Sequence, residues 1–283
     1  MKSLLKGFVI VNDFVRGIKD MPVLNFRKTD FIPETLPQEK IVITVDGPAA
    51  SGKGTLAKKL AERLGYAHLD TGALYRAVAM ATLEIGGDPT KYVDVKPALD
   101  IIKRNLTPEL LSSPALRTPE VSEAASKVSS LPEVREALLQ YQRDYAKNLP
   151  DYVGGVVMDG RDIGTVVCPD ADIKFFITAS VEERARRRFL ELQNRETDDN
   201  SFDKVLADLT ARDQRDQTRK ISPLVAAEDA YILDTTKLDP SETLDEAIGV
   251  IRSSFLSETN DNAAAKIRAN FSKTPPNTDK KAI

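Results

Sequence analysis

A stretch of nine residues, Gly-Pro-Ala-Ala-Ser-Gly-Lys-Gly-Thr, has the composition of a phosphate-binding loop. Its first two glycines are separated by four residues, and a lysine follows the second. In such a loop the glycines let backbone N–H groups turn inward onto phosphate oxygens, and the lysine adds a positive charge. A tight turn without a ligand is the alternative interpretation. The residues that would hold the phosphates are Gly47, Pro48, Ala49, Ala50, Ser51, Gly52, Lys53, Gly54 and Thr55.

The elements on either side of this loop favour the phosphate interpretation. The apolar run from Ile41 to Asp46 predicts a strand before the loop. Leu56, Leu60 and Leu64 recur every four residues with charged residues between them, so an amphipathic helix is predicted to begin at the loop. The N-terminus of that helix would direct unpaired N–H groups at an anion.

Two further stretches combine charged side chains with glycines. Residues 69–76 read Leu-Asp-Thr-Gly-Ala-Leu-Tyr-Arg and stand where a second strand would end. Residues 159–164 read Asp-Gly-Arg-Asp-Ile-Gly and follow another apolar run. A capped helix and a structural turn are the alternatives, but charged loops with free glycines are more often functional. The candidate side chains are Thr71, Arg76, Asp159, Arg161 and Asp162.

The run from Arg184 to Arg219 contains eight arginines, yet its bases exceed its acids by only one. A nucleic-acid groove would not be neutralised so evenly. Arg212, Asp216 and Arg219 recur at spacings of three and four residues, which places them on one helical face. A solvated face of ion pairs is the alternative. Guanidiniums turned inward from such a face are what a site for two phosphates needs.

The order of the expected elements predicts an α/β fold with a parallel sheet flanked by helices. Apolar runs at 41–46, 155–158, 172–178 and 230–233 read as strands, and ligands then bind beyond their carboxyl ends. We expect the main domain to span 41–258, with an inserted subdomain at 77–150 that is helical from 121 to 147. We also expect a loosely attached extension at 1–40, a lid at about 195–201 and a polar mobile tail at 259–283.

Composition excludes several classes of protein. A net charge of −3 argues against a general nucleic-acid or anionic-membrane binder. A single cysteine, Cys168, forms no disulfide framework, so the cytoplasm is the expected compartment. No apolar run approaches the length of a membrane span. The only histidine, His68, has no Cys/His cluster around it, and we assign it no role.

Taken together, these motifs closely resemble the bacterial cytidylate kinases. The likeness runs from about Ile41 to Phe255 and includes the stretches 122–126 and 134–139. The order Lys53-Gly54-Thr55 also resembles nucleoside monophosphate kinases, whereas GTPases and most ATPases place Ser or Thr directly after the lysine. The resemblance implies a P-loop fold with an inserted subdomain that binds the nucleoside monophosphate and a short lid.

The resemblance also implies roles for individual residues. It implies that Lys53, Arg161 and Arg212 are catalytic, and that Arg76 and Arg161 grip the acceptor phosphate. The group implied around the cytosine is Ser126, Arg135, Asp159 and Arg219, and the group around the ribose is Thr71, Asp162, Arg212 and Asp216. Magnesium would be held mainly by water and phosphates, with no protein ligand.

The implied reaction is transfer of the γ-phosphoryl group of ATP to CMP or dCMP by a monomeric enzyme without nucleic-acid or membrane partners. If Asp159 accepts from the cytosine amino group, its replacement by alanine should narrow the preference for CMP over UMP. A kinase acting on UMP or AMP is one alternative, and a nucleotide-binding regulator without turnover is another.

Overall fold

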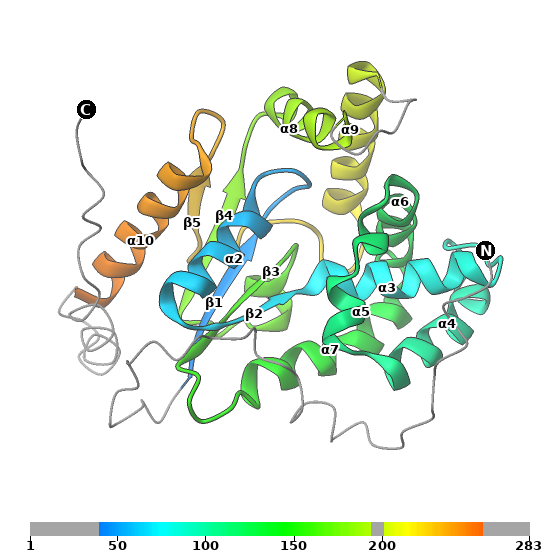
Figure 1. Ribbon diagram of the computed structural model, residues 1–283, viewed down its shortest axis with the longest axis horizontal. Helices are drawn as coiled ribbons and strands as arrows, with labels where there is room; N and C mark the ends of the chain where they lie inside the picture. Colours follow the sequence, from blue (N-terminus) through cyan, green and yellow to red (C-terminus); the bar gives the residue numbers. More distant parts are fainter. Residues whose placement is uncertain (1–39, 194–200, 257–283) are drawn as a thin grey trace.

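The computed structural model describes residues 40–193 and 201–256. Five parallel strands form one sheet in the order β2-β3-β1-β4-β5, and helices lie on both of its faces (Figure 1). The strands are β1 (Ile41–Asp46), β2 (Ala67–Asp70), β3 (Gly155–Gly160), β4 (Ile173–Thr178) and β5 (Tyr231–Asp234). The strands expected from the apolar runs are confirmed, and β2 lies where a second strand was expected to end.

The helices form two groups. Helix α2 (Lys53–Leu64) follows the loop, and α10 (Pro240–Leu256) ends the described chain. Between β4 and β5 lie α8 (Val181–Gln193) and α9 (Phe202–Thr218). Those between β2 and β3 are α3 (Thr71–Glu84), α4 (Tyr92–Asn105), α5 (Pro108–Ser112), α6 (Pro119–Val128) and α7 (Pro132–Lys147), with a 3₁₀ turn at Pro114–Arg117. A π-helical turn, η2 (Ile163–Val167), follows β3.

The two faces of the sheet pack against different helices, because successive side chains of a strand point to opposite faces. Ile43 of β1 shares an apolar cluster with Leu60 of α2 and Ile251 of α10. Met158 of β3 belongs to a second cluster, which includes Leu74 of α3 and extends through the helices between β2 and β3. Both clusters hold the carboxyl ends of the strands in place.

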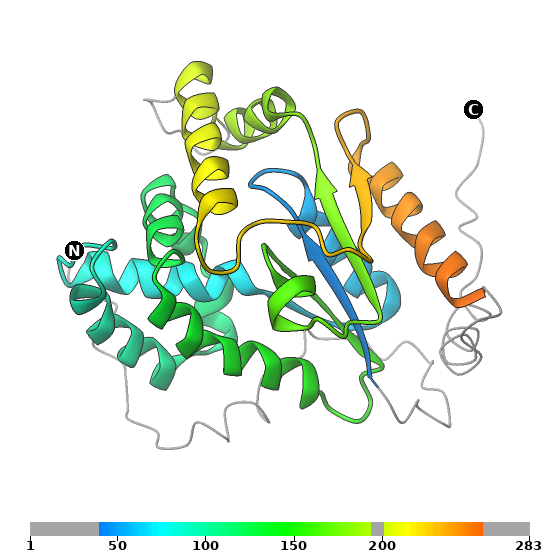
Figure 2. The same cartoon turned by 180° about the vertical axis from the view of Figure 1, so that it is seen from behind.

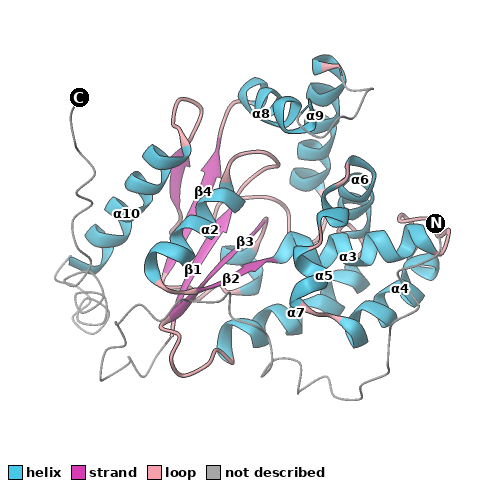
Figure 3. Ribbon diagram, in the orientation of Figure 1, coloured by secondary structure: helices cyan, strands magenta, loops and turns pink. Residues whose placement is uncertain are grey.

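The segment 121–147 is helical, as predicted, and the structure divides it into two helices (Figure 3). Over 121–147, α6 ends at Val128 and α7 begins at Pro132. Proline has no backbone N–H and is tolerated in the first turn of a helix, so it starts a new helix here instead of continuing the old one. Three more prolines between β2 and β3 stand at the first position of a helical segment, namely Pro108, Pro114 and Pro119.

The connection from α9 to β5 passes across the sheet (Figure 2) and is fixed by Lys174 of β4, which donates to Asp229 at 2.9 Å. The predicted extension, lid and tail lie outside the described residues. Only Lys40 of the extension and Ser201 of the lid are described. Within the described ranges, no helix combines the length and the apolar character that crossing a membrane requires.

Candidate active site

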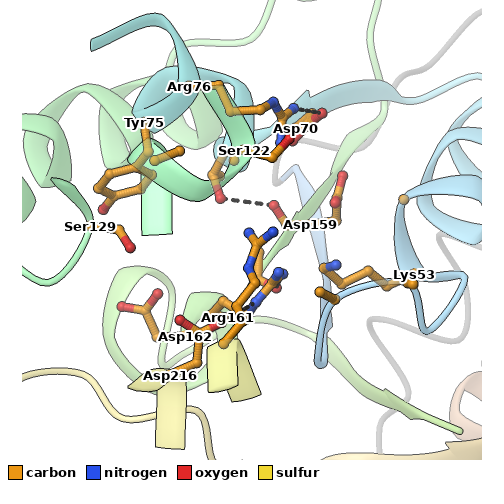
Figure 4. A pocket seen from close by; sticks show the side chains of 18 of the residues that line it. Lys53, Asp70, Tyr75, Arg76, Ser122, Ser129, Asp159, Arg161, Asp162 and Asp216 are labelled. Carbon is orange, nitrogen blue, oxygen red and sulfur yellow. Dashed lines mark hydrogen bonds and ion pairs between the residues drawn. The ribbon is translucent and has the colours of Figure 1, made fainter. Parts of the chain in front are cut away.

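A cavity of about 260 Å³ lies beyond the carboxyl ends of β1, β2 and β3 (Figure 4). The loop before α2, helices α3, α6, α7, α8 and α9, and the 3₁₀ turn before α6 also supply residues to its walls. Most of the predicted site residues come together here although they are far apart in the sequence. Those that line the cavity are Ala49, Ala50, Lys53, Gly54, Thr71, Arg76, Arg135, Asp159, Arg161, Asp162, Arg212, Asp216 and Arg219.

The other predicted residues lie outside this cavity. Ser126 is buried in α6, and its Oγ atom has no hydrogen-bond partner among the described residues. Ser122 and Ser129, nearby on the chain, line the cavity instead. The predicted loop residues outside the cavity are Gly47, Pro48, Ser51, Gly52 and Thr55, of which Ser51, Gly52 and Thr55 line a second cavity of about 500 Å³ on the other side of the loop.

The backbone of the loop depends on its glycines. Gly47 has φ +149°, and a Cβ atom at that position would stand 2.1 Å from the carbonyl oxygen of Ile177. Gly52 has φ +89° and caps the N-terminus of α2, whose first residue is Lys53. Only glycine adopts such conformations without strain, so the loop and the start of the helix require glycine at both positions.

Lys53 reaches the cavity from the phosphate-loop side, whereas Tyr75 and Ser129 stand on the opposite side and Arg161 lies between them (Figure 4). Burial lowers the pKa of Lys53 to about 7, and the positive charge of Arg161 adds to the shift. Burial and Arg161 also lower the pKa of Arg212, to about 10. Lys53 and Arg212 form no ion pair with a described carboxylate and are both repelled by Arg161, so this wall of the cavity is electrostatically complementary to phosphate.

Other cations of the cavity are paired with carboxylates. Arg161 Nε lies 3.1 Å from Asp216 Oδ2. Arg135 Nη2 donates a very short hydrogen bond to Asp162, and Arg219 Nη2 lies 3.7 Å from the same carboxylate. Asp162, which the resemblance placed with the ribose group, is therefore in contact with two residues of the cytosine group.

The end of β2 orients a second arginine. Arg76 Nη2 donates to Asp70 Oδ2 at 2.6 Å, and the other oxygen of Asp70 accepts from the backbone N–H of Ala73, which caps α3. Thr71 donates its hydroxyl to the carbonyl oxygen of Asp159 at 2.8 Å, so α3 is attached to the end of β3. These contacts fix the direction from which the Arg76 guanidinium approaches the cavity.

Sequence reasoning missed two residues beneath the site. Asp46 is buried and accepts from the backbone N–H groups of Ile163 and Gly164, at 2.9 and 2.8 Å. Burial raises the pKa of Asp46 to about 7. His68 Nε2 lies 2.9 Å from Asp159 Oδ1. A polar residue ending an otherwise apolar strand signals Asp46, whereas nothing local to His68 identifies its partner.

Comparison with known proteins identifies the family. The family profile described as Cytidylate kinase matches residues 43–253. Cytidylate kinases of Granulibacter bethesdensis and Paramagnetospirillum magneticum are each 49% identical to this chain, and the alignments cover 75% of the chain and 97% and 98% of those relatives. The cytidylate kinase of Rhodospirillum rubrum is 49% identical over 211 residues, with 75% and 97% coverage. The chain therefore belongs to the cytidylate kinase family and has its P-loop nucleoside monophosphate kinase fold.

Proposed function

We propose that the protein transfers the γ-phosphoryl group of ATP to CMP and dCMP, giving CDP or dCDP and ADP. The observation that carries this proposal is the convergence of Lys53, Arg161 and Arg212 from three elements on one cavity. A nearby anion would offset the repulsion between these half-buried cations, and two phosphates brought together need the same compensation.

The loop separates two cavities, and ATP would occupy both. The triphosphate would lie along the backbone N–H groups of the loop, with Lys53 near the transferred phosphoryl group. The nucleoside would lie in the second cavity, between the loop and residues 235–240. Thr235 supports this arrangement because its hydroxyl donates to the carbonyl oxygen of Ser51 at 3.0 Å, which joins the two walls.

The acceptor would lie on the opposite side, among the paired charges. Cytosine presents an amino donor next to two ring acceptors. Asp162, held between Arg135 and Arg219, offers a carboxylate next to guanidinium donors, which matches that pattern. Arg76 and Arg161 would hold the acceptor phosphate. Asp216 would contact the ribose, and Arg212 would contact both the ribose and the transferred phosphoryl group.

Asp159 is better placed for the donor phosphates than for the base. Its Oδ1 atom faces His68, and its Oδ2 atom lies 3.5 Å from where a Cβ atom of Gly54 would stand, beside the phosphate loop. The described residues contain no cluster of three or more His, Cys, Asp or Glu side chains able to hold a metal ion. We infer that Mg²⁺ is held mainly by phosphates and water, with Asp159 as an acceptor for that water. The bound metal would neutralise phosphate charge.

The reaction needs no general base, because the nucleophile is an oxygen of an already ionised phosphate. The protein's contribution is to align the two phosphates and to offset their charge as the transition state forms. Lys53 and Arg212 suit this role, since neither forms an ion pair with a described carboxylate.

The test is release of ADP by the purified protein, measured with CMP, dCMP, UMP and AMP as acceptors. We expect the highest kcat/KM with CMP and dCMP. A preference for UMP or AMP would reassign the acceptor, and ATP binding without turnover on any of the four would favour a regulator. The D159A variant distinguishes the two roles considered for Asp159. If the ratio of kcat/KM for CMP to that for UMP is unchanged, Asp159 acts near the donor phosphates. If the ratio falls, Asp159 contacts the cytosine base.

A further inference from the structure

Helix α8 is attached to the phosphate loop by Arg184, which does not line the cavity. Arg184 is only 6% exposed and donates to the carbonyl oxygen of Ala49 at 3.3 Å. Its Nε atom donates to the carbonyl oxygen of Ala179, at 2.9 Å, directly after β4. One buried guanidinium therefore fixes both the loop and the start of α8.

The same guanidinium reaches the neighbouring helix α9. Arg184 Nη1 lies 2.6 Å from Asp213 Oδ2, and both side chains are largely buried. An apolar cluster surrounds the junction, since Ala49 of the loop packs with Ala185 of α8 and Leu209 of α9. The loop, α8 and α9 thus meet at one point, where an ion pair lies beside a small apolar core.

Asp213 lies on α9 between two residues that line the cavity. It directly follows Arg212 and precedes Asp216 by one turn, and both of these neighbours line the cavity. Neither Arg184 nor Asp213 lines the cavity. Because α9 is a rigid helix, fixing Asp213 fixes the rotation of α9 about its axis, and with it the direction in which Arg212 points.

We propose that Arg184 and Asp213 are positioning residues that hold the phosphate loop and α9 in a fixed position and orientation relative to each other. This proposal rests on the proposed function, because it assigns the pair the task of keeping Lys53 and Arg212 on the same transferred phosphoryl group. A buried ion pair adds little net stability when compared with an apolar replacement, but it specifies geometry. Misplacing a catalytic group by about 1 Å costs about 100-fold in rate.

The test compares D213N and R184K with a matched control, D229N. Asp229 also pairs with a buried cation, Lys174, at 2.8 Å, but lies outside the cavity. We expect kcat to fall at least about 10-fold in D213N and R184K, with the KM for ATP changed less than about 3-fold. D213E, which keeps the charge, should recover part of the lost kcat, and D229N should keep the wild-type kcat.

Each variant is assayed below its own unfolding temperature, with the acceptor that the wild-type protein prefers. A purely structural pair would lower Tm while kcat stays within about two-fold of wild type, and that result would overturn the proposal. If D213N does not fold, R184K decides, because lysine keeps the positive charge but loses the guanidinium that bridges three elements. Inactivity of wild type and D229N on all four monophosphates would instead overturn the proposed function.

Discussion

We expect ATP binding to depend on pH through the ammonium group of Lys53. Burial and the neighbouring Arg161 lower the pKa of Lys53 to about 7 in the protein without nucleotide. The phosphates of ATP favour the charged ammonium, so binding should raise this pKa again. ATP binding above neutral pH must therefore take up a proton on Lys53.

The size of the effect follows from the pKa. At pH 7 about half of the Lys53 side chains are already charged, so ATP binding should take up about 0.5 proton. At pH 8 about one tenth are charged, and the uptake should rise to about 0.9 proton. By the same linkage, ATP should bind about five-fold more weakly at pH 8 than at pH 7.

Titration calorimetry of ATP binding without an acceptor measures this uptake, using buffers of different ionisation enthalpy and saturating Mg²⁺. Titration of ATP itself contributes to the signal of every variant. The informative quantity is therefore the difference between wild type and K53Q. Lys58 lies on the same helix, pairs with Glu62 at 3.9 Å and lines neither cavity, so K58Q is the matched control and should retain the wild-type uptake.

One outcome would refute this reasoning. If wild type and K53Q take up the same number of protons at pH 8, although K53Q binds ATP more weakly, then Lys53 is charged before ATP arrives. The close approach of Lys53, Arg161 and Arg212 would then cost far less than their burial implies. The electrostatic basis of the proposed function would have to be sought elsewhere.

Three further predictions concern the carboxylates. D162N leaves two guanidiniums without their shared anion, so kcat/KM for CMP should fall about 100-fold or more in steady-state assays while ATP binding alone is unchanged. Because the pKa of Asp46 rises from 3.8 to about 7 on folding, its contribution to stability is lost as pH rises through that interval, and D46N should flatten this decline in urea unfolding. H68L removes a partner of Asp159 and should raise the Mg²⁺ concentration required for half-maximal rate several-fold, whereas H68Q keeps a donor and should change it less.

The sequence predicted the parts of the fold that depend on local spacing. The loop, its preceding strand and the helix behind it are contiguous, so the pattern from Ile41 to Leu64 was enough to predict all three. The break between α6 and α7 is also local, since Pro132 marks it, although the expectation of a helical segment over 121–147 did not include it. Helical periodicity indicates that a segment is helical more reliably than it shows where one helix ends.

Contacts across the chain could not be predicted in this way. Asp46 and Ile163 are 117 residues apart, and His68 and Asp159 are 91 apart. No spacing rule relates such positions, because their proximity depends on the order β2-β3-β1 of the strands. The motifs identify which residues belong to the site, whereas the sheet determines which of them touch.

The strand order also explains why carboxylates surround a site built for anions. Asp46, Asp70 and Asp159 lie at the carboxyl ends of three adjacent strands, where each contacts a backbone N–H group, an arginine or a histidine. These contacts hold the polar groups around the cavity before a substrate arrives, which lowers the cost of arranging them in the transition state. Lys53 and Arg212 have no such carboxylate partner within the described chain, so in the proposed function the phosphates of the substrates supply the anions that these two cations lack.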